Sequence, residues 1–217
     1  GMASRAPAGA WLGAALAYGW HDSDPPHLEA AWVQAEARRV LDSFGVPQRA
    51  DYHPEIDTGI HAMMVVDQSA LRNFGLPVRF AALTHDLGKA ETPADILPRH
   101  LGHEERSVRL SEQLSERLRV PNDCRDLALL TARYHGNIHR AGDLKASTIV
   151  TLFEKTDALR RPERFGQLLE ACLCDYTGRL GWENRPYDSP AYLLAALATV
   201  NAVEAGKIAA ECADKAK

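Results

Sequence analysis

The sequence predicts an all-α fold, a helical bundle, and three observations support this prediction. Apolar residues recur at helical spacing through most of the chain, and capping residues, prolines and glycines divide it into segments of helical length. Alternating patterns typical of strands are nearly absent. With 217 residues, 46% of them hydrophobic, the chain is long enough to bury one substantial core.

The first three expected helices cover residues 25–44, 58–74 and 77–88. A proline pair begins the first helix, and Gly45 and Pro47 end it. Asp57 can cap the second helix, and Gly75 follows its end. A proline begins the third helix, which we expect to end at Gly88 in a left-handed conformation that costs glycine little.

Five further helices are expected over residues 104–119, 121–134 or beyond, 147–161, 163–177 and 190–213. Prolines begin the second and the last of these, and Ser147 caps the third. No repeat or linker divides them, so residues 25–217 are predicted to form a single domain. Residues 1–24 are interpreted as an N-terminal extension, in which a tag scar precedes an apolar segment.

Composition excludes several classes of protein. The net charge of -4 argues against a whole-domain electrostatic grip on nucleic acid. The apolar segment 10–20 is too short to span a bilayer, so we predict no membrane association. The four cysteines form no paired ligand set, and a reducing cytoplasm is the expected location. Residues 11–20 and the alanine-rich last helix could form the interface of a homodimer.

His85 and Asp86 stand side by side near the end of the third expected helix, with Gly88 and Lys89 directly behind them. His85 lies near the inward edge of that helix, and Asp86 is turned from it by about 100°. Both can reach one point only where the helix end meets another element. Imidazole and carboxylate are ligands for divalent metals, so the pair could supply two ligands of a metal site, but two ligands alone do not define one.

Two further residues complete the predicted ligand set. His61 lies in the first turns of the expected helix 58–74. Asp157 follows Ile149 and Phe153 at steps of four, so an apolar stripe would carry its carboxylate inward. A buried carboxylate needs a cation beside it, and a metal ion would supply one.

Each of these residues also has an interpretation without a metal. His61 could be an ordinary core or surface histidine. Asp157 could form a salt bridge with the arginines that follow it, and Lys89 could interact with the dipole of a helix C-terminus. Only the combined order of the predicted ligands favours a metal site.

The order His61, His85-Asp86, Asp157 resembles that of the HD-domain metal-dependent phosphohydrolases, which implies an HD-domain helical bundle. A narrower resemblance runs from about Phe44 to Tyr187. There the chain is similar to the C-terminal HD domain of bacterial multifunctional CCA-adding proteins, the tRNA nucleotidyltransferases. The segments that carry it are FGVPQRADYHPEIDTGIH, VRFAALTHDLGKAETP, RHLGHEERS, RLRVPNDCRDLALLTARYH and LFEKTDALRRPERF.

The resemblance implies a hydrolase of phosphomonoesters and 2′,3′-cyclic nucleotides, with 2′,3′-cyclic phosphodiesterase, 2′-nucleotidase and phosphatase activities. It implies a divalent cofactor (Ni, Mg, Mn, Co or Zn) bound by His61, His85, Asp86 and Asp157. Asp86 would also orient the attacking water, and Lys89 would act with it by contacting a phosphate oxygen. The implied partners are a small phosphate ester or cyclic nucleotide, and the tRNA 3′ end.

Other residues are expected to bind substrate. His103 begins the helix 104–119, where the positive helix end and Arg106 could attract phosphate. His135 could bind substrate or support a ligand, whereas His139, four residues later, is expected to be exposed at a helix end. Asp175, with Arg179, could close the pocket by a salt bridge.

Two alternative functions stay open. The domain could be another HD-family nucleotidase that acts on nucleoside monophosphates, or a module that binds tRNA or a partner while its catalysis is vestigial. The complete set of ligands favours an enzyme. Nothing before Phe44 has the length or the residues of the nucleotidyltransferase head of the CCA proteins, so we do not expect CCA addition.

Overall fold

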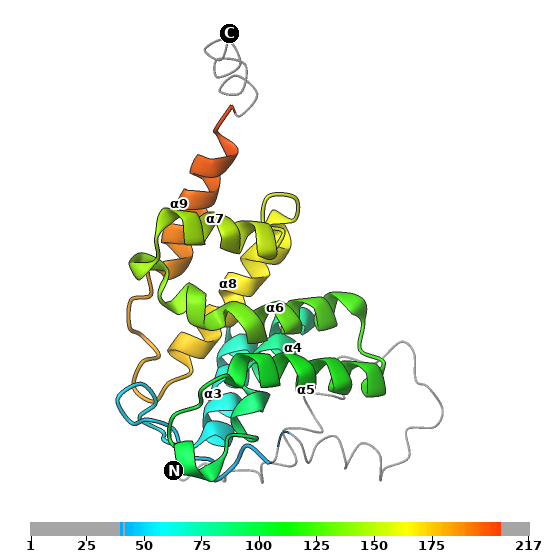
Figure 1. The fold of residues 1–217 in the computed structure, drawn as a ribbon, viewed down its shortest axis with the longest axis vertical. Helices are drawn as coiled ribbons and strands as arrows, with labels where there is room; N and C mark the ends of the chain where they lie inside the picture. The colour runs from blue at the N-terminus through cyan, green and yellow to red at the C-terminus, as the bar shows by residue number, and fades with distance from the viewer. Residues whose placement is uncertain (1–39, 41, 205–217) are drawn as a thin grey trace.

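The computed structural model describes residue 40 and residues 42–204, and this part of the chain contains helices and no strand, which confirms the all-α prediction (Figure 1). Its α-helices are α3 (Thr58–Leu71), α4 (Leu76–Thr84), α5 (His103–Leu118), α6 (Asn122–His139), α7 (Ala146–Lys155), α8 (Pro162–Thr177) and α9 (Ser189–Asn201). Three 3-10 segments lie between them: η1 (Leu87–Lys89), η2 (Ala94–Ile96) and η3 (Ala141–Asp143). The predicted extension 1–24, most of the expected helix 25–44 and the end of the expected helix 190–213 lie outside the described residues.

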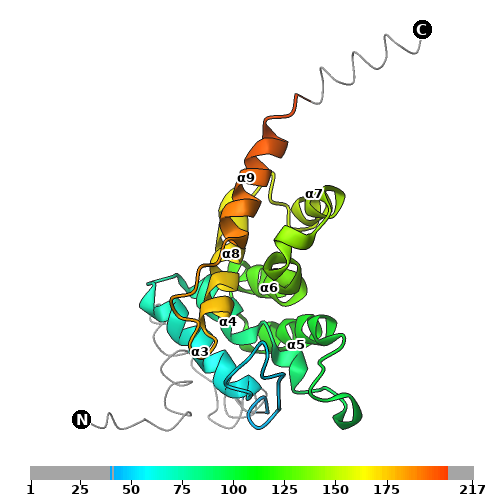
Figure 2. The ribbon, with the colours of Figure 1, turned by 90° about the vertical axis from the view of Figure 1, so that its left-hand side faces the viewer.

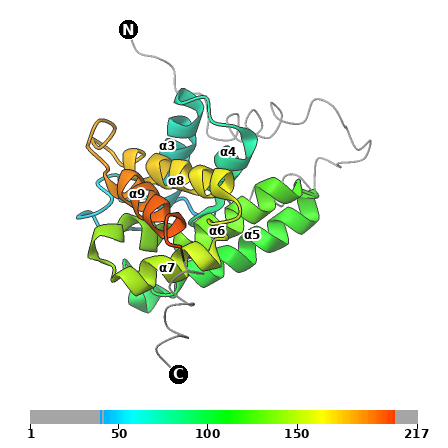
Figure 3. The same ribbon diagram turned by 90° about the horizontal axis from the view of Figure 1, so that it is seen from above.

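Helix α4 lies at the centre of the bundle, where it contacts α3, α6 and α8. Helix α5 packs against α6, and the two run side by side in Figures 1 and 3. Helix α9 projects beyond α8, as Figure 2 shows, and buries only Leu193 and Leu197. The core between the helices is apolar and includes Leu127, Phe153 and Leu168. The end of α4 is therefore surrounded by other helices, which can bring side chains to it.

Asp57 caps α3, as its position in the sequence predicts. One carboxylate oxygen accepts hydrogen bonds from the backbone N–H groups of Gly59 and Ile60, at 2.8 and 3.0 Å. The other oxygen accepts one from Gly45, at 2.7 Å. The cap satisfies backbone donors at the helix start and holds the preceding loop against it. That loop carries Glu55, which takes part in the site.

Gly88 does not adopt the left-handed conformation that the sequence suggested, because α4 ends at Thr84 and η1 continues the chain. Glycine is needed there for a different reason. A Cβ atom on Gly88 would lie 2.3 Å from the backbone oxygen of His103 and 2.4 Å from the backbone nitrogen of Ser107. The Gly88 N–H donates to the Ser107 hydroxyl at 2.8 Å. This close approach sets the first turn of α5 beside the His85-Asp86 pair.

The helix expected to reach residue 161 ends earlier, at Lys155, and this changes the position of Asp157. Asp157 adopts a left-handed conformation with φ of 57°. Its N–H donates to the Glu154 carbonyl at 3.1 Å, and the Ala158 N–H donates to the Phe153 carbonyl at 2.9 Å. These two bonds form a Schellman motif, which ends α7 at Lys155 with Thr156 as the C-cap. The apolar stripe therefore stops before it can carry Asp157 inward.

Candidate metal centre

His85 and Asp86 lie directly after α4, and both side chains are buried. The His85 Nδ1–H donates to the carbonyl of Ala82 at 2.8 Å, which directs Nε2 into the site. This Nε2 atom lies 3.2 Å from Asp86 Oδ2 and 3.8 Å from Asp175 Oδ2. The end of α4 thus places one imidazole between two carboxylates.

His61 reaches the same place from the second turn of α3 and is fully buried. Its Nδ1 lies 2.8 Å from Glu55 Oε1, and its Nε2 lies 3.0 Å from Asp175 Oδ1. A carboxylate that accepts the Nδ1 proton of a histidine fixes the tautomer in which Nε2 can bind a metal. Glu55 therefore has the position of a supporting carboxylate behind His61.

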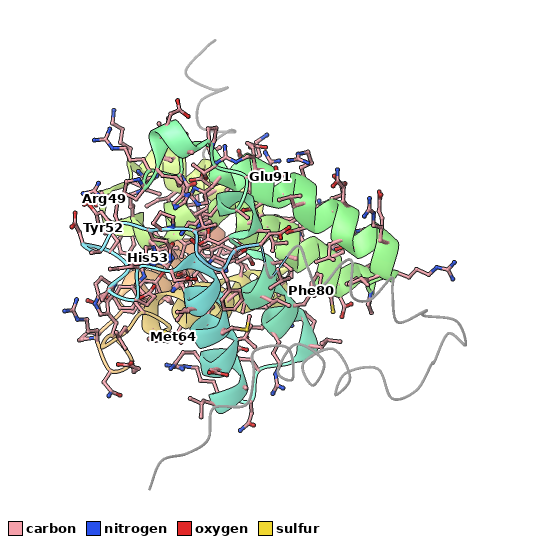
Figure 4. The ribbon with its side chains drawn as sticks, turned by 90° about the horizontal axis from the view of Figure 1, so that it is seen from below. Arg49, Tyr52, His53, Met64, Phe80 and Glu91 are labelled. Carbon is pink, nitrogen blue, oxygen red and sulfur yellow. The ribbon has the colours of Figure 1, made fainter. Side chains whose placement is uncertain are left out.

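Glu55 belongs to the loop that precedes α3, part of which is labelled in Figure 4. Arg49, Tyr52 and His53 lie together on the loop that precedes α3. His53 Nδ1 is 3.0 Å from the same Glu55 oxygen that faces His61. The loop therefore contacts His61 at Nδ1, on the opposite side of the ring from the Nε2 atom that faces Asp175.

His103 and His135 form a second part of the cluster. The Nδ1–H of His103 donates to the carbonyl of His100 at 2.8 Å, and that of His135 donates to the carbonyl of Thr131 at 2.9 Å. Their Nε2 atoms lie 3.4 Å apart. They approach Asp86 Oδ1 at 3.3 and 3.6 Å respectively. Asp86 thus has histidines on both of its oxygens.

His85, His103 and His135 share one arrangement, in which Nδ1 donates to a backbone carbonyl and Nε2 faces a buried carboxylate. His61 Nε2 also faces a carboxylate, and its Nδ1 lies close to Glu55 without a well-aligned hydrogen bond. The buried His85 Nε2 and Asp86 Oδ1 atoms have no well-aligned hydrogen-bond partner. Acceptor atoms that converge without donors are costly unless a cation or a proton lies among them. The donor set of imidazole nitrogens and carboxylates fits a divalent metal ion.

The ligand-atom spacing supports this conclusion. His61, His85 and Asp86 each offer one ligand atom within 4.8 Å of the others, and so do Asp86, His103 and His135. Asp86 belongs to both groups. The structure therefore brings together all but one of the residues that the sequence predicted as ligands.

Asp157 is the exception. It forms ion pairs with Arg160, Arg161 and Arg164, at 2.6, 3.6 and 3.9 Å, and the first two of these arginines are largely exposed. The carboxylate in the cluster is instead Asp175, in the last turn of α8. Asp175 also forms the ion pair with Arg179 that the sequence suggested, at 3.6 Å.

Asp175 could have been found from its spacing. Phe165, Leu168 and Cys172 are buried on one face of α8, and Asp175 continues their three-, four- and three-residue steps. Glu55 carries no such signal, because it lies in a loop and not on a periodic helix face.

Lys89 is buried at the edge of the cluster, where its Nζ lies 2.6 Å from Asp86 Oδ2 and 2.5 Å from Gln48 Oε1. Arg106 is placed differently from the expectation that it faces phosphate. Its guanidinium donates to the carbonyls of Gly88 and Leu101, both at 2.9 Å, and also to the Thr92 hydroxyl. Arg106 therefore holds the segment after η1 against α5.

The buried carboxylates remain charged. Burial alone would raise the pKa of Asp86, but Lys89 and His85 hold it well below its usual range. Burial would also raise the pKa of Asp175, but His139, His85 and His61 hold it well below its usual range. The site therefore presents two anions to any cation bound between them.

The histidines in the cluster titrate in different directions. Burial lowers the pKa of His135 to about 3, so that its imidazole is neutral and Nε2 retains its lone pair. Burial would also lower the pKa of His85, but the charges of Asp86 and Asp175 raise it to about 9. Without a bound metal, a proton on His85 supplies the positive charge between these two carboxylates.

This helical bundle, with its buried histidine and aspartate cluster, defines the class of protein. The model of the HD domain family matches residues 58–173, and the chain belongs to this family. The chain is 86% identical over 174 residues to the multifunctional CCA protein of Dechloromonas aromatica, a match that covers 80% of this chain and 42% of that protein. It is 61% identical over 208 residues to the multifunctional CCA protein of Burkholderia multivorans, which covers 93% of this chain and 50% of that protein.

A third relative, the multifunctional CCA protein of Paraburkholderia phymatum, is 63% identical over 166 residues. The chain spans about half or less of the length of each of these relatives. No solved structure matches the chain significantly. Within the part that the structure describes, none of the helices has the length and apolar character needed to cross a bilayer.

Proposed function

We propose that this domain is a metal-dependent phosphohydrolase. The observation that carries the proposal is the convergence of Nε2 atoms from several helices on two buried, charged carboxylates. A cluster of this kind needs positive charge among its acceptors, and a divalent cation would supply more of it than Lys89 and a proton on His85 do. Membership of the HD domain family supports the same assignment.

The proposed ligands of the metal are His61, His85, Asp86 and Asp175, with Asp175 in the place first expected for Asp157. When bound, a divalent ion would supply Lewis acidity and lower the pKa of a water molecule. Its identity among Ni, Mg, Mn, Co and Zn is left open by a donor set that mixes nitrogen and oxygen.

We assign His103 and His135 to the same centre. Because the backbone holds their Nδ1 protons, their Nε2 lone pairs are oriented to bind a cation with Asp86 and not to donate to a phosphate. We therefore propose a ligand role for both histidines, in place of the substrate-binding or supporting role expected from the sequence.

The chain's own residues have distinct roles in hydrolysis. A water oxygen forms a bond to phosphorus and loses a proton, the ester P–O bond breaks, and the leaving oxygen takes up the proton that the water has lost. Asp86 would accept a hydrogen bond from the attacking water and so orient it. Lys89, buried beside Asp86, would offset the negative charge that develops on the phosphate oxygens. We do not retain Arg106 in this set, because three of its donors are already bound within the protein.

The proposed substrates are phosphomonoesters and 2′,3′-cyclic nucleotides, with a cyclic phosphate at a tRNA 3′ end as a larger substrate of the same chemistry. The support is the similarity to multifunctional CCA proteins over the region that this chain covers. A nucleotidase that acts on nucleoside monophosphates is the alternative within the same enzyme class.

The test uses the purified chain, stripped of metal and then supplied with Mn²⁺, Ni²⁺ or Mg²⁺ in turn. We expect hydrolysis of 2′,3′-cyclic AMP or of an aryl phosphate with at least one ion, and at least a 100-fold loss in Asp86→Asn. The control variant is Asp95→Asn, which changes an exposed carboxylate in η2 and should retain activity. Full activity of Asp86→Asn would overturn the proposed mechanism. Preference for nucleoside monophosphates would support the alternative.

A further inference from the structure

Asp175, His139 and Tyr187 form a chain of hydrogen bonds, the arm, which runs from the proposed metal centre to the loop between α8 and α9. His139 Nε2 lies 2.6 Å from Asp175 Oδ2, the shortest contact that this carboxylate makes. On the other side of the ring, His139 Nδ1 lies 2.9 Å from the hydroxyl of Tyr187. His139, expected from the sequence to be exposed, is in fact partly buried at the end of α6.

The charge of Asp175 determines where the hydrogen between it and His139 lies. Asp175 is charged and can only accept, so His139 Nε2 must carry the hydrogen. The tyrosine hydroxyl is the partner of Nδ1 on the other side of the ring, and burial raises the pKa of Tyr187, which keeps its hydroxyl protonated.

Packing holds Tyr187 in position for this contact. Its ring stacks on Tyr176 of α8, with centroids 4.4 Å apart and planes inclined by 13°. Tyr176 in turn contacts Trp182, at 5.1 Å between centroids, and the Arg179 guanidinium lies over both rings. The loop after α8 therefore packs against the end of α8, the helix that carries Asp175.

We propose that Tyr187 and His139 are positioning residues that hold Asp175 in the orientation needed to bind the divalent ion. The inference rests on the proposed function, since Asp175 is a ligand only if the centre binds metal. Asp175 Oδ2 accepts the His139 Nε2–H, so the carboxylate is held on one side by a group that is not a proposed ligand, while Oδ1 faces His61 Nε2. Outer partners of metal ligands typically contribute about 10- to 100-fold to metal affinity or activity.

The test compares variants that keep the shape of the arm and change its hydrogen bonds. Tyr187→Phe removes the hydroxyl and keeps the stacked ring, and Tyr176→Phe is the matched control in the neighbouring ring. We expect the Mn²⁺ dissociation constant, measured by titration calorimetry, to rise roughly two- to tenfold in Tyr187→Phe and to stay unchanged in the control.

For His139, which lies between Tyr187 and Asp175, His139→Leu should raise the Mn²⁺ dissociation constant by about 10- to 100-fold. His139→Gln should retain most of the affinity, because its amide can still donate to Asp175.

A second readout does not depend on metal or turnover. In the metal-free protein, Tyr187→Phe should perturb the ¹⁵N shift of His139 Nδ1, and Tyr176→Phe should not. Equal Mn²⁺ affinities and equal shifts in Tyr187→Phe and Tyr176→Phe would overturn the inference while leaving the proposed function intact. Failure of the wild type itself to bind a divalent ion would overturn the proposed function and this inference with it.

Discussion

At the candidate metal centre, the orientation of each imidazole depends on the group that contacts its Nδ1 atom. The backbone carbonyls behind His85, His103 and His135 select which nitrogen faces inward, and the Glu55 carboxylate lies beside Nδ1 of His61. This selection requires no metal, so the ligand geometry exists before an ion binds. Such preorganisation limits the cost of assembling the site.

The assignment of Asp175 in place of Asp157 leads to a prediction at the residue scale. Asp175→Asn should weaken Mn²⁺ binding by at least about 100-fold and abolish hydrolysis, since loss of a ligand should cost no less than loss of an outer partner. Asp157→Asn should change neither quantity, because this carboxylate contacts exposed arginines and asparagine tolerates the left-handed conformation. Titration calorimetry and a phosphate-release assay measure both effects. The reverse order of losses would restore Asp157 as the ligand.

At the scale of elements, the site depends on how closely η1 approaches α5. The backbone of α5 lies where a side chain on Gly88 would have to go, so this glycine sets the distance between Asp86 and His103. The loop before α3 supplies a second contact, because Gln48 reaches Lys89 from that loop. Elements that are distant in the sequence thus meet around the end of α4.

Gly88→Ala should therefore destabilise the fold by about 1–3 kcal/mol, because neither contacting backbone atom can move without shifting α5. Gly142→Ala is the matched control. A Cβ atom at Gly142 meets nothing within 4 Å, and this glycine has no positive φ, so the change should be within about 1 kcal/mol. Urea unfolding followed by circular dichroism measures both variants. Equal stabilities would show that α5 is not held as closely as the structure indicates.

For the whole molecule, the shifted histidines predict how stability depends on pH. Burial lowers the pKa values of His53, His100 and His135 from 6.5 to about 4, 4 and 3. The unfolded chain then binds more protons than the folded chain below about pH 6.5, so stability falls as the pH falls. His85 acts in the opposite direction, because its pKa is raised from 6.5 to about 9 in the folded protein. Its contribution is present below pH 6.5 and is lost as the pH rises toward 9.

We therefore expect the metal-free protein to be most stable near pH 6.5. Thermal unfolding in a chelating buffer, followed between pH 4 and 9, measures this directly. His85→Gln should remove the alkaline decline while leaving the acidic one, since the other histidines are unchanged. A stability that rises steadily from pH 6.5 to 9 in the wild type would contradict the raised pKa of His85.

Much of the bundle could be predicted from the sequence because its signals are local. Apolar periodicity located the helices α3 to α9, and the cap at Asp57 was correct because capping depends on adjacent residues. Local spacing failed at Asp157, where the helix ended sooner than its apolar stripe suggested. It also misjudged His139, since a residue at a helix end can be covered by a distant loop.

The sequence by itself determined that the chain is helical and that His61, His85 and Asp86 belong to one site, because residue types and their order carry that information. Only the tertiary structure decided that Asp175 joins them, that Asp157 and Arg106 do not, and that Glu55 and His139 lie behind the proposed ligands. The physical reason is that convergence depends on how helices cross and where loops return. These are set by packing between segments far apart in the chain, which no local spacing records.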